Sequence, residues 1–331
     1  MYKILVIGSN SPSGASFIKK CITKSTDVIG ISRSSEYDEV FLPYKWKPDY
    51  SDKFYRFIQI DLNKDRARLA SLIRDFKPNY VVNFAAQSMV GESWDNPCHW
   101  YQTNVISNIN LHNILLKCKS LAKYIHISTP EVYGNCSGVI TENTIYSPST
   151  PYATSRACCD MHLLNYFNTH NFPVVYTRAA NVYGPGQQLY RIIPRTILNI
   201  LLGKKLSLHG GGKSIRSFIY LEDVAEATWQ IMLNGTPPSI YHLSTNEYIS
   251  IKDLVLKICT YLECDFDSLV NITEDRPGKD AAYTLSSDKL RKDFDWSEKF
   301  SLEKGIQLTV EWVKNNLDKL EALPLNYIHK E

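Results

Sequence analysis

The sequence lacks the features that mark secreted, membrane-spanning and zinc-binding proteins. Its eight cysteines include the adjacent pair Cys158 and Cys159 but no C-x-x-C pair, so their spacing indicates neither a disulfide framework nor a zinc site. Nowhere are there 18 consecutive apolar residues, and the opening MYKILVIG has no basic region of the signal-peptide kind. Secretion and membrane spanning are therefore disfavoured, and we expect reduced thiols in a cytoplasmic protein.

A strong excess of one charge is also absent. The 37 Lys and Arg residues against 34 Asp and Glu residues give a net charge of +3, and no basic block is long enough for a nucleic-acid footprint. His99, His126 and His209 have no second ligand at metal-binding spacing, so no metal site is predicted. With 44% hydrophobic residues among 331, the chain is expected to be globular, with one large domain and a smaller one.

Short apolar runs alternate with helical stretches along the first half of the chain. The runs lie at 3–8, 27–32, 54–60, 80–85, 124–129 and 173–178. This alternation predicts an α/β fold, a Rossmann-type doubly wound parallel sheet covered on both faces. We assign 1–180 to the sheet domain, with a later strand near 240–244, and 181–331 mainly to a smaller, discontinuous C-terminal lobe. Apolar positions at helical spacing predict a closing helix at 301–319.

A glycine loop after the first strand points to a dinucleotide. In GSNSPSG, Gly8 and Gly14 are six residues apart, and Ser11 stands where the usual G-x-x-G-x-x-G loop has its middle glycine. Such a loop lets the backbone approach a pyrophosphate at a helix N-terminus. We predict cofactor contacts from Gly8, Asn10, Ser11 and Gly14. The alternative is a plain strand–turn–helix.

The second strand ends without the acidic residue that an NAD-type site carries. Ser32 and Arg33 stand there instead, and an arginine between hydroxyls suits a 2′-phosphate. NADP is therefore favoured over NAD, unless Arg33 is simply solvated. Asp61 and Leu62 are expected near the adenine, although Asp61 could instead cap a helix. Ala85 is expected near the cofactor.

The later motifs resemble a known family. The run YIHIS leads into Ser128-Thr129-Pro130-Glu131, and TPYATSRA at 150–157 sets Tyr152 four residues before Arg156 on one helical face. With the glycine loop, NFAAQS at 83–88 and NVYGPG at 181–186, the sequence resembles the extended short-chain dehydrogenase/reductases along nearly its whole length. Within that family it is most similar to the nucleotide-sugar 4,6-dehydratases acting on dTDP-glucose or GDP-mannose.

The resemblance implies catalytic roles. Tyr152 would remove the proton from the sugar 4-hydroxyl as hydride passes from C4 to the nicotinamide, helped by Thr129 and by Arg156 in the place of the family lysine. Tyr152 and Arg156 would then also contact the cofactor. A free tyrosine titrates near ~10, so a neighbouring cation is needed to make the phenolate accessible. Arginine supplies that charge but is bulkier and never deprotonated.

Pro130 and Glu131 leave the identity of the product open. Glu131 stands at the family's position for the base that removes the C5 proton, whereas Pro130 replaces the acid that helps to expel the 6-hydroxyl in the dTDP-glucose enzymes. The reaction could therefore give the 4-keto-6-deoxy sugar, or stop at an epimer, a decarboxylated sugar or a 5,6-alkene. A binding protein without turnover is a third interpretation.

The resemblance also implies a nucleoside-diphosphate sugar as the bound partner. Planar arginines suit its pyrophosphate. The predicted substrate residues are Gln87, Ser88, Asn181, Arg191, Arg216 and Arg276, with Asn104 lining the site or bracing its loop and Arg195 as a further candidate. Helices near 98–118 and 151–168 carry apolar residues on more than one face, and related enzymes pair through them, so a homodimer is expected.

Overall fold

The core of the protein is a seven-stranded parallel sheet. The computed structural model describes residues 1–46, 53–136, 138–274 and 284–330. The strands run in the order β11-β7-β5-β4-β1-β2-β3, and every pairing between neighbours is parallel. Their bounds are β1 Lys3–Ile7, β2 Asp27–Ser32, β3 Tyr55–Gln59, β4 Tyr80–Asn83, β5 Lys123–Ile127, β7 Val174–Ala179 and β11 Ile240–Leu243. The predicted Rossmann-type sheet is confirmed.

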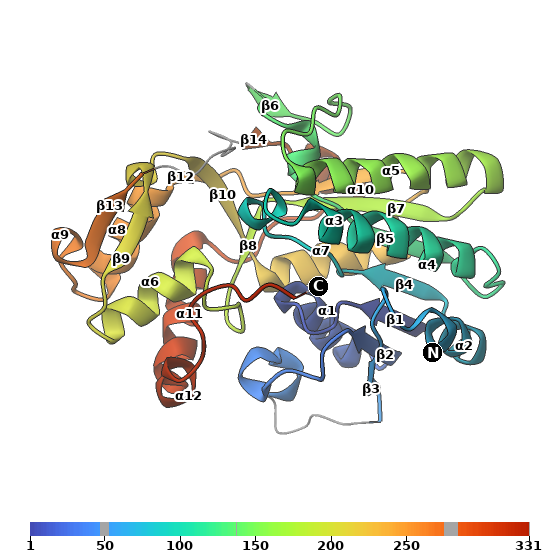
Figure 1. Cartoon of the computed structure of the whole chain (residues 1–331), viewed down its shortest axis with the longest axis horizontal. Coiled ribbons are helices and arrows are strands. Elements are labelled where there is room, and N and C mark those ends of the chain that lie inside the picture. Colours follow the sequence, from blue (N-terminus) through green and yellow to red (C-terminus); the bar gives the residue numbers. More distant parts are fainter. Residues whose placement is uncertain (47–52, 137, 275–283, 331) are drawn as a thin grey trace.

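Helices cover both faces of this sheet (Figure 1). Successive side chains of a strand point to opposite faces. In β1, Ile4 and Val6 pack with α1 (Pro12–Thr23) and α7 (Leu221–Asn234), whereas Leu5 and Ile7 pack with the opposite layer. That second layer comprises α2 (Arg66–Phe76), α4 (Asn108–Leu115) and α5 (Pro151–His170). Burial on both faces explains why the strands read as continuous apolar runs.

The strand order reverses beside β1, which pairs with β2 on one side and with β4 on the other. Parallel sheets bind ligands outside the carboxyl ends of the strands at such a switch point. The loops after β1, β2, β4 and β5 therefore define where a site is expected.

A smaller lobe follows β7 in the chain and packs around its own core. It contains the three-stranded sheet β12-β10-β8 and the pair β13-β9. Its helices α6, α8 and α11 bury apolar faces against one another and against β8 and β10. The bounds are β8 Asn181–Tyr183, α6 Ile192–Leu201, β9 Leu206–His209, β10 Ile215–Tyr220, β12 Tyr248–Ser250, α8 Ile251–Tyr261, α9 Phe266–Leu269, β13 Val270–Thr273, α11 Leu302–Asn315 and α12 Leu317–Glu321.

The remaining elements lie near α5 and at the sheet edge. A short parallel pair joins β6 (Val139–Ile140) to β14 (Thr284–Leu285), and α10 (Asp288–Phe294) packs against the layer of α7. The helix α3 (Pro97–Tyr101) continues through a π-helical turn at Gln102–Ser107 into α4. The predicted closing helix is present as α11 and α12.

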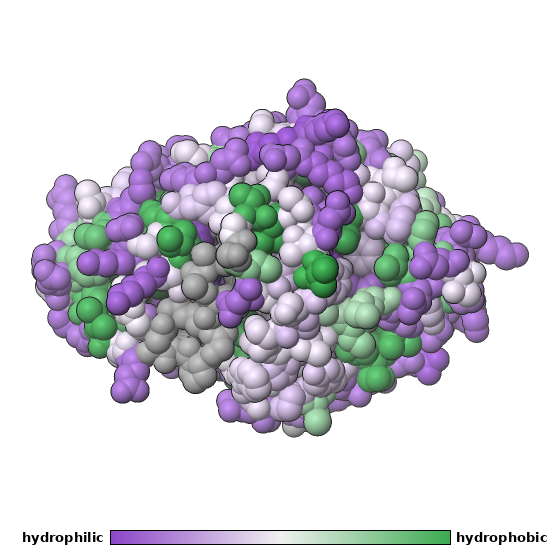
Figure 2. Space-filling view, turned by 90° about the horizontal axis from the view of Figure 1, so that it is seen from above, coloured by the Kyte–Doolittle hydropathy of each residue, from purple (hydrophilic) through white to green (hydrophobic). Residues whose placement is uncertain are grey.

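The surface is mixed in polarity. On the face that carries β6, β14 and α5, apolar residues form separate groups among polar ones (Figure 2). Met161 and Leu164 of α5 are exposed, whereas Ala157 is buried. All eight cysteines are unpaired. Within the described ranges, no helix is both long and apolar enough to cross a membrane.

Candidate active site

The glycine loop after β1 is closely packed. Gly8 has a φ of +80°, a conformation that glycine adopts easily, and a Cβ there would lie 2.6 Å from the Ala85 nitrogen. A Cβ on Gly14 would lie 2.4 Å from the Gly8 carbonyl oxygen. Ser11 caps α1, because its Oγ accepts from the Gly14 nitrogen at 3.0 Å and donates to the Gly8 carbonyl at 2.7 Å. The serine that replaces the middle glycine therefore stabilises the helix N-terminus.

The end of β2 is tied to this loop. The Ser32 Oγ accepts from the Asn10 backbone nitrogen at 3.0 Å, and the Asn10 side chain donates to the Ser35 carbonyl at 2.8 Å. The Asn10 Oδ1 is buried without a hydrogen-bond partner in the described structure, so it is available to a ligand hydroxyl. Arg33 donates from Nη1 to the Lys330 carbonyl at 2.9 Å.

The ends of β3 and β4 are also ordered by local bonds. Asp61 closes a turn by accepting from the Asn63 nitrogen at 2.8 Å, and Leu62 is buried in the core beside α2. Gln87 is 1% exposed, and Asn104 braces its backbone with two bonds, one in each direction, at 2.9 and 3.0 Å. Asn104 therefore acts as a brace of the loop rather than as a group exposed to substrate.

Thr129 and Tyr152 come together at the junction of β5 and α5. Thr150 caps α5 by accepting from the Ala153 nitrogen at 3.1 Å, which sets Tyr152 in the first turn. Thr129 lies close enough to Tyr152 to lower its pKa, and both residues are buried, at 7% and 5% exposure. The pairing predicted from the two motifs is present.

The pKa of Tyr152 is nevertheless raised to about 12, against the expectation that the neighbouring cation would make the phenolate accessible. Burial is the largest cause, and the Glu131 carboxylate adds to it. Arg156, Thr129 and Arg191 lower the pKa but do not outweigh those two effects. The phenol is therefore protonated at neutral pH in the protein alone.

Arg156 lies deep between α5 and β5, with 1% of its surface exposed. Its Nη2 donates to the Ile127 carbonyl and lies 3.2 Å from the His126 Nε2. Its Nη1 is buried without a hydrogen-bond partner among the described residues, so that nitrogen is available to an added ligand. The family lysine is thus replaced by a longer side chain that is anchored on the strand.

His126 also contacts Asp160, which is four residues beyond Arg156 on α5. The His126 Nε2 lies 3.3 Å from Asp160 Oδ1, and Arg178 donates to Asp160 Oδ2 at 2.8 Å. Burial alone would raise the pKa of Asp160, but Arg178 and His126 hold it well below its ordinary value. Burial lowers the pKa of His126 to about 4, so this histidine is neutral. We call Tyr152, Arg156 and Asp160, with His126, the α5 seam.

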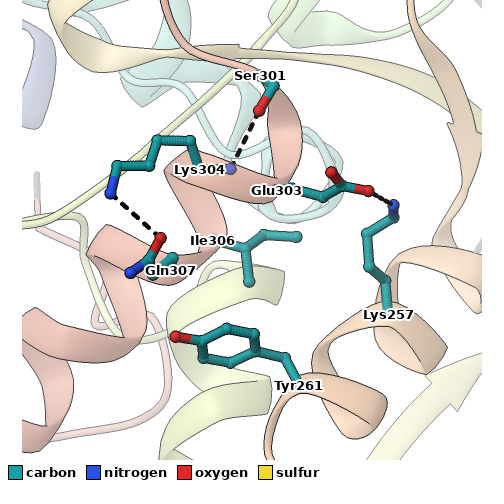
Figure 3. Close-up of a pocket in the computed structure, with 7 residues that line it drawn as sticks. All are labelled: Lys257, Tyr261, Ser301, Glu303, Lys304, Ile306 and Gln307. Carbon is teal, nitrogen blue, oxygen red and sulfur yellow. Dashed lines mark hydrogen bonds and ion pairs between the residues drawn. The ribbon is translucent and has the colours of Figure 1, made fainter.

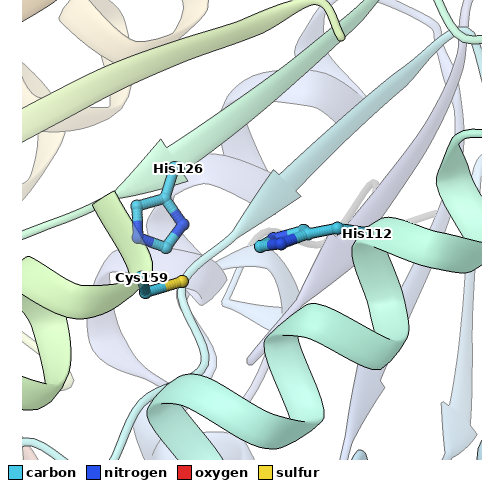
Figure 4. A group of neighbouring side chains, drawn as sticks. All are labelled: His112, His126 and Cys159. Atoms are coloured by element: carbon cyan, nitrogen blue, oxygen red, sulfur yellow. The ribbon is translucent and has the colours of Figure 1, made fainter. Parts of the chain in front are cut away.

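His126 has two further neighbours that sequence spacing did not indicate. His112 of α4 and Cys159 of α5 place ligand-type atoms within 4.8 Å of one another and of His126 (Figure 4). All three side chains are buried. The guanidinium of Arg156 lies against this group. Burial lowers the pKa of His112, and Arg156 lowers it further. Burial raises the pKa of Cys159, and Arg156 acts against that rise. A fixed cation at this position disfavours a divalent metal ion there.

The local structure of the loop after β5 suits a proline at position 130. Thr129 caps a short 3₁₀ helix, Pro130–Tyr133, by accepting from the Glu131 nitrogen, and Pro130 occupies its first position. Proline suits that position because the nitrogen there needs no hydrogen. Glu131 is half-buried and close enough to Tyr152 to raise its pKa.

The predicted substrate residues are less closely grouped. Arg191 lies near enough to lower the pKa of Tyr152, and its guanidinium covers the Tyr190 ring at 5.3 Å. Ser88 and Asn181 are exposed, Arg216 is half-buried on β10, and Arg276 lies outside the described residues.

A separate pocket lies on the smaller lobe between α8 and α11. Its lining includes Lys257, which pairs with Glu303 at 2.7 Å, and Tyr261 (Figure 3). None of the predicted catalytic or cofactor residues lines it.

Sequence reasoning missed three groups at the site. His126 and Asp160 join the α5 seam, and Lys330 reaches the loops after β2 and β4. Asp160 could have been found, because Tyr152, Arg156 and Asp160 recur every four residues on one helical face. Nothing in the sequence pattern indicates the contact of Lys330.

Comparison with known proteins decides the family. Residues 5–309 match the sequence model of the GDP-mannose 4,6 dehydratase family. The chain belongs to this family. The chain is 30% identical over 330 residues to the probable dTDP-glucose 4,6-dehydratase of Sinorhizobium fredii, and the match covers 95% of this chain and 93% of that protein.

Solved structures agree with this dehydratase family membership. The dTDP-glucose 4,6-dehydratase of Streptomyces venezuelae, solved with NAD bound, is 27% identical with a TM-score of 0.88, covering 96% of this chain and 99% of that one. The UDP-glucose 4-epimerase of Thermotoga maritima, solved with UDP-glucose, is 25% identical with a TM-score of 0.84, covering 95% and 99%.

Proposed function

We propose that the protein is an NAD(P)-dependent nucleotide-sugar 4,6-dehydratase. The observation that carries the proposal is the convergence of Thr129, Glu131 and Tyr152 at the carboxyl end of β5, with Arg156 anchored beneath them. The match to the dehydratase family and the similarity to dTDP-glucose 4,6-dehydratases support this activity.

The residues present fit a dinucleotide. Gly8 and Gly14 leave no room for side chains in the loop, and the buried Asn10 Oδ1 and Arg156 Nη1 each lack a partner in the described structure. A bound nicotinamide would accept hydride from C4 of the sugar and later return it. We propose NAD rather than the NADP that the sequence favoured, because the similar dehydratase from Streptomyces venezuelae carries NAD.

Tyr152 and Glu131 would carry out different proton transfers. Tyr152 would take the proton from the 4-hydroxyl, with Thr129 beside it and Arg156 supplying positive charge. Glu131 would remove the C5 proton, which a ketone at C4 makes acidic. Since Pro130 has no acidic side chain, Glu131 is also the carboxyl on this loop that could protonate the departing 6-hydroxyl.

A second candidate is a 4-epimerase of the same fold, favoured by Pro130 and by the similarity to the Thermotoga maritima epimerase. Both reactions share Tyr152 and oxidation at C4. They differ at C6, because only a dehydratase removes the 6-hydroxyl.

The test is an incubation with dTDP-glucose, UDP-glucose and GDP-mannose in deuterated water, followed by NMR. We expect a 4-keto-6-deoxy product with deuterium at C5. A C4 epimer that keeps its 6-hydroxyl would identify the epimerase instead. Absence of product from all three sugars, with dinucleotide binding intact, would refute turnover on these substrates.

We further propose a homodimer formed through the helical segment 98–118 and α5, where Ile106, Leu116, Met161 and Leu164 are exposed. Sedimentation at micromolar concentration tests it, and a monomeric mass would refute it. We keep the division near residue 180, with α7 and β11 assigned to the dinucleotide-binding unit, and the cytoplasm as the expected compartment.

A further inference from the structure

A segment after the last helix lies across the carboxyl ends of β2, β1 and β4, the place assigned to the dinucleotide. Residues 322–330 leave α12 in the smaller lobe and return to the central sheet, and in Figure 1 the red end of the chain runs back from α12 towards the middle of the molecule. The Lys330 carbonyl accepts from Gln87 Nε2 at 2.6 Å and from Arg33 Nη1 at 2.9 Å. We call residues 322–330 the strap.

The two donors bracket the glycine loop. Arg33 follows β2 and Gln87 follows β4, and β1, which ends at the residue before Gly8, lies between those strands. A carbonyl that reaches both donors therefore crosses the end of β1. A sheet of this topology binds its ligand at the same place.

Ring stacking holds the end of the strap. The His329 imidazole lies parallel to the Trp100 indole, with centroids 5.2 Å apart and 7° between the planes. It also stacks on His99 at 5.1 Å and 4°, and the His99 Nδ1 lies 2.8 Å from the His329 Nε2. Trp100 is fully buried, so the strap covers a wall of the fold rather than lying loosely over it.

The middle of the strap makes further contacts. The Tyr327 hydroxyl donates to Gln87 Oε1 at 3.4 Å, and the Tyr327 ring meets the edge of Tyr190 at 5.5 Å. Arg195 donates to Asn326 Oδ1 at 3.2 Å. The Gln87 side chain thus bonds the strap twice, because its amide nitrogen donates to Lys330 and its amide oxygen accepts from Tyr327.

We propose that the strap is a built-in competitor of the dinucleotide, which lies over these strand ends in the cofactor-free protein and leaves them when the cofactor binds. This inference rests on the proposed function, because it takes these strand ends as the dinucleotide site. Its physical basis is shared donors. Arg33 and Gln87 give to the strap carbonyl the hydrogen bonds that ligand oxygens would otherwise accept.

The experiment compares four proteins freed of bound dinucleotide: the full chain, His329→Ala, a chain that ends at residue 325, and Ile328→Ala as a matched control. Ile328 belongs to the strap but is 61% exposed. Titration calorimetry with NAD is expected to give about tenfold tighter binding for His329→Ala and for the shortened chain, which corresponds to ~1.4 kcal/mol. The control should bind as the full chain does.

Amide hydrogen exchange measures the strap directly in the full chain. We expect exchange at residues 326–330 to become faster when NAD is added. Slower exchange, or unchanged or weaker NAD binding after strap removal, would overturn the competition and leave the proposed function standing. Failure of all four proteins to bind NAD or NADP would overturn both proposals.

Discussion

The contact between Arg156 and His126 predicts that these two side chains act together on Tyr152. Arg156 lowers the pKa of Tyr152, and its Nη2 lies 3.2 Å from the His126 Nε2. Replacing His126 with Phe keeps a ring in the buried strand but removes that partner. We expect the guanidinium to be held less firmly, the pKa of Tyr152 to rise further and the activity to fall.

The size of the effect follows from the type of bond. A hydrogen bond to a charged group contributes about 1.5–3 kcal/mol. Lysine at 156 keeps the charge but lacks the planar guanidinium that reaches both His126 and the Ile127 carbonyl. We therefore expect a coupling energy of about 1–2 kcal/mol between Arg156→Lys and His126→Phe, or about 5–30-fold in kcat/KM.

The assay is kcat/KM on dTDP-glucose from pH 6 to 10 for the wild type, both single variants and the double variant. His126→Gln, which retains hydrogen-bonding atoms, should recover part of the loss and of the pH shift. Arg156→Lys should keep measurable activity, whereas Arg156→Ala should lose most of it. Strictly additive effects would refute the coupling, and wild-type activity in Arg156→Ala would remove the role of the cation.

Three further changes test other parts of the site. Glu131→Gln removes the carboxylate that raises the pKa of Tyr152, so the pH profile of oxidation at C4 should shift to a lower pKa. NMR in deuterated water should show no deuterium at C5, and deuterium at C5 would contradict the assignment of Glu131 as the base. Gly14→Ala places a Cβ 2.4 Å from the Gly8 carbonyl, so calorimetry should show at least about hundredfold weaker NAD binding, and equal binding would speak against the loop. Burial lowers the pKa of His126 to about 4, so the unfolded chain binds more protons below pH ~6.5, and this group should lower the stability by up to ~3 kcal/mol from pH 6.5 to 4. In urea unfolding, His126→Phe should make that slope shallower, whereas the part due to His112 and His242, whose pKa burial also lowers, should remain; an unchanged slope would contradict this.

The sheet and its loops were predictable because their signals are local. Each strand of the first half is a buried apolar run, and the loop glycines show in their spacing, although the backbone that Gly8 meets belongs to Phe84 and Ala85. Ser11 was interpreted as a weakened match to the glycine pattern. The structure gives it a reason, since it caps the helix that follows.

The electrostatics of the site were not predictable in the same way. Spacing placed Tyr152 and Arg156 on one helical face, but it could not tell how deeply they are buried or how near Glu131 lies. Those two quantities decide that the pKa of Tyr152 rises to about 12. The sequence spacing showed no partner for His126, because its neighbours come from other elements. In the same way, the strap joins residues 297 positions apart.

The proline in the loop after β5 has a stereochemical consequence. In the proposed mechanism Glu131, the carboxyl of this loop, withdraws the hydrogen from C5 and also hands it to the leaving oxygen. Both bonds must then break on the same side of the hexose, and the expelled water carries the hydrogen that C5 gave up. Under the proposed roles, Pro130 therefore predicts a syn course for the elimination.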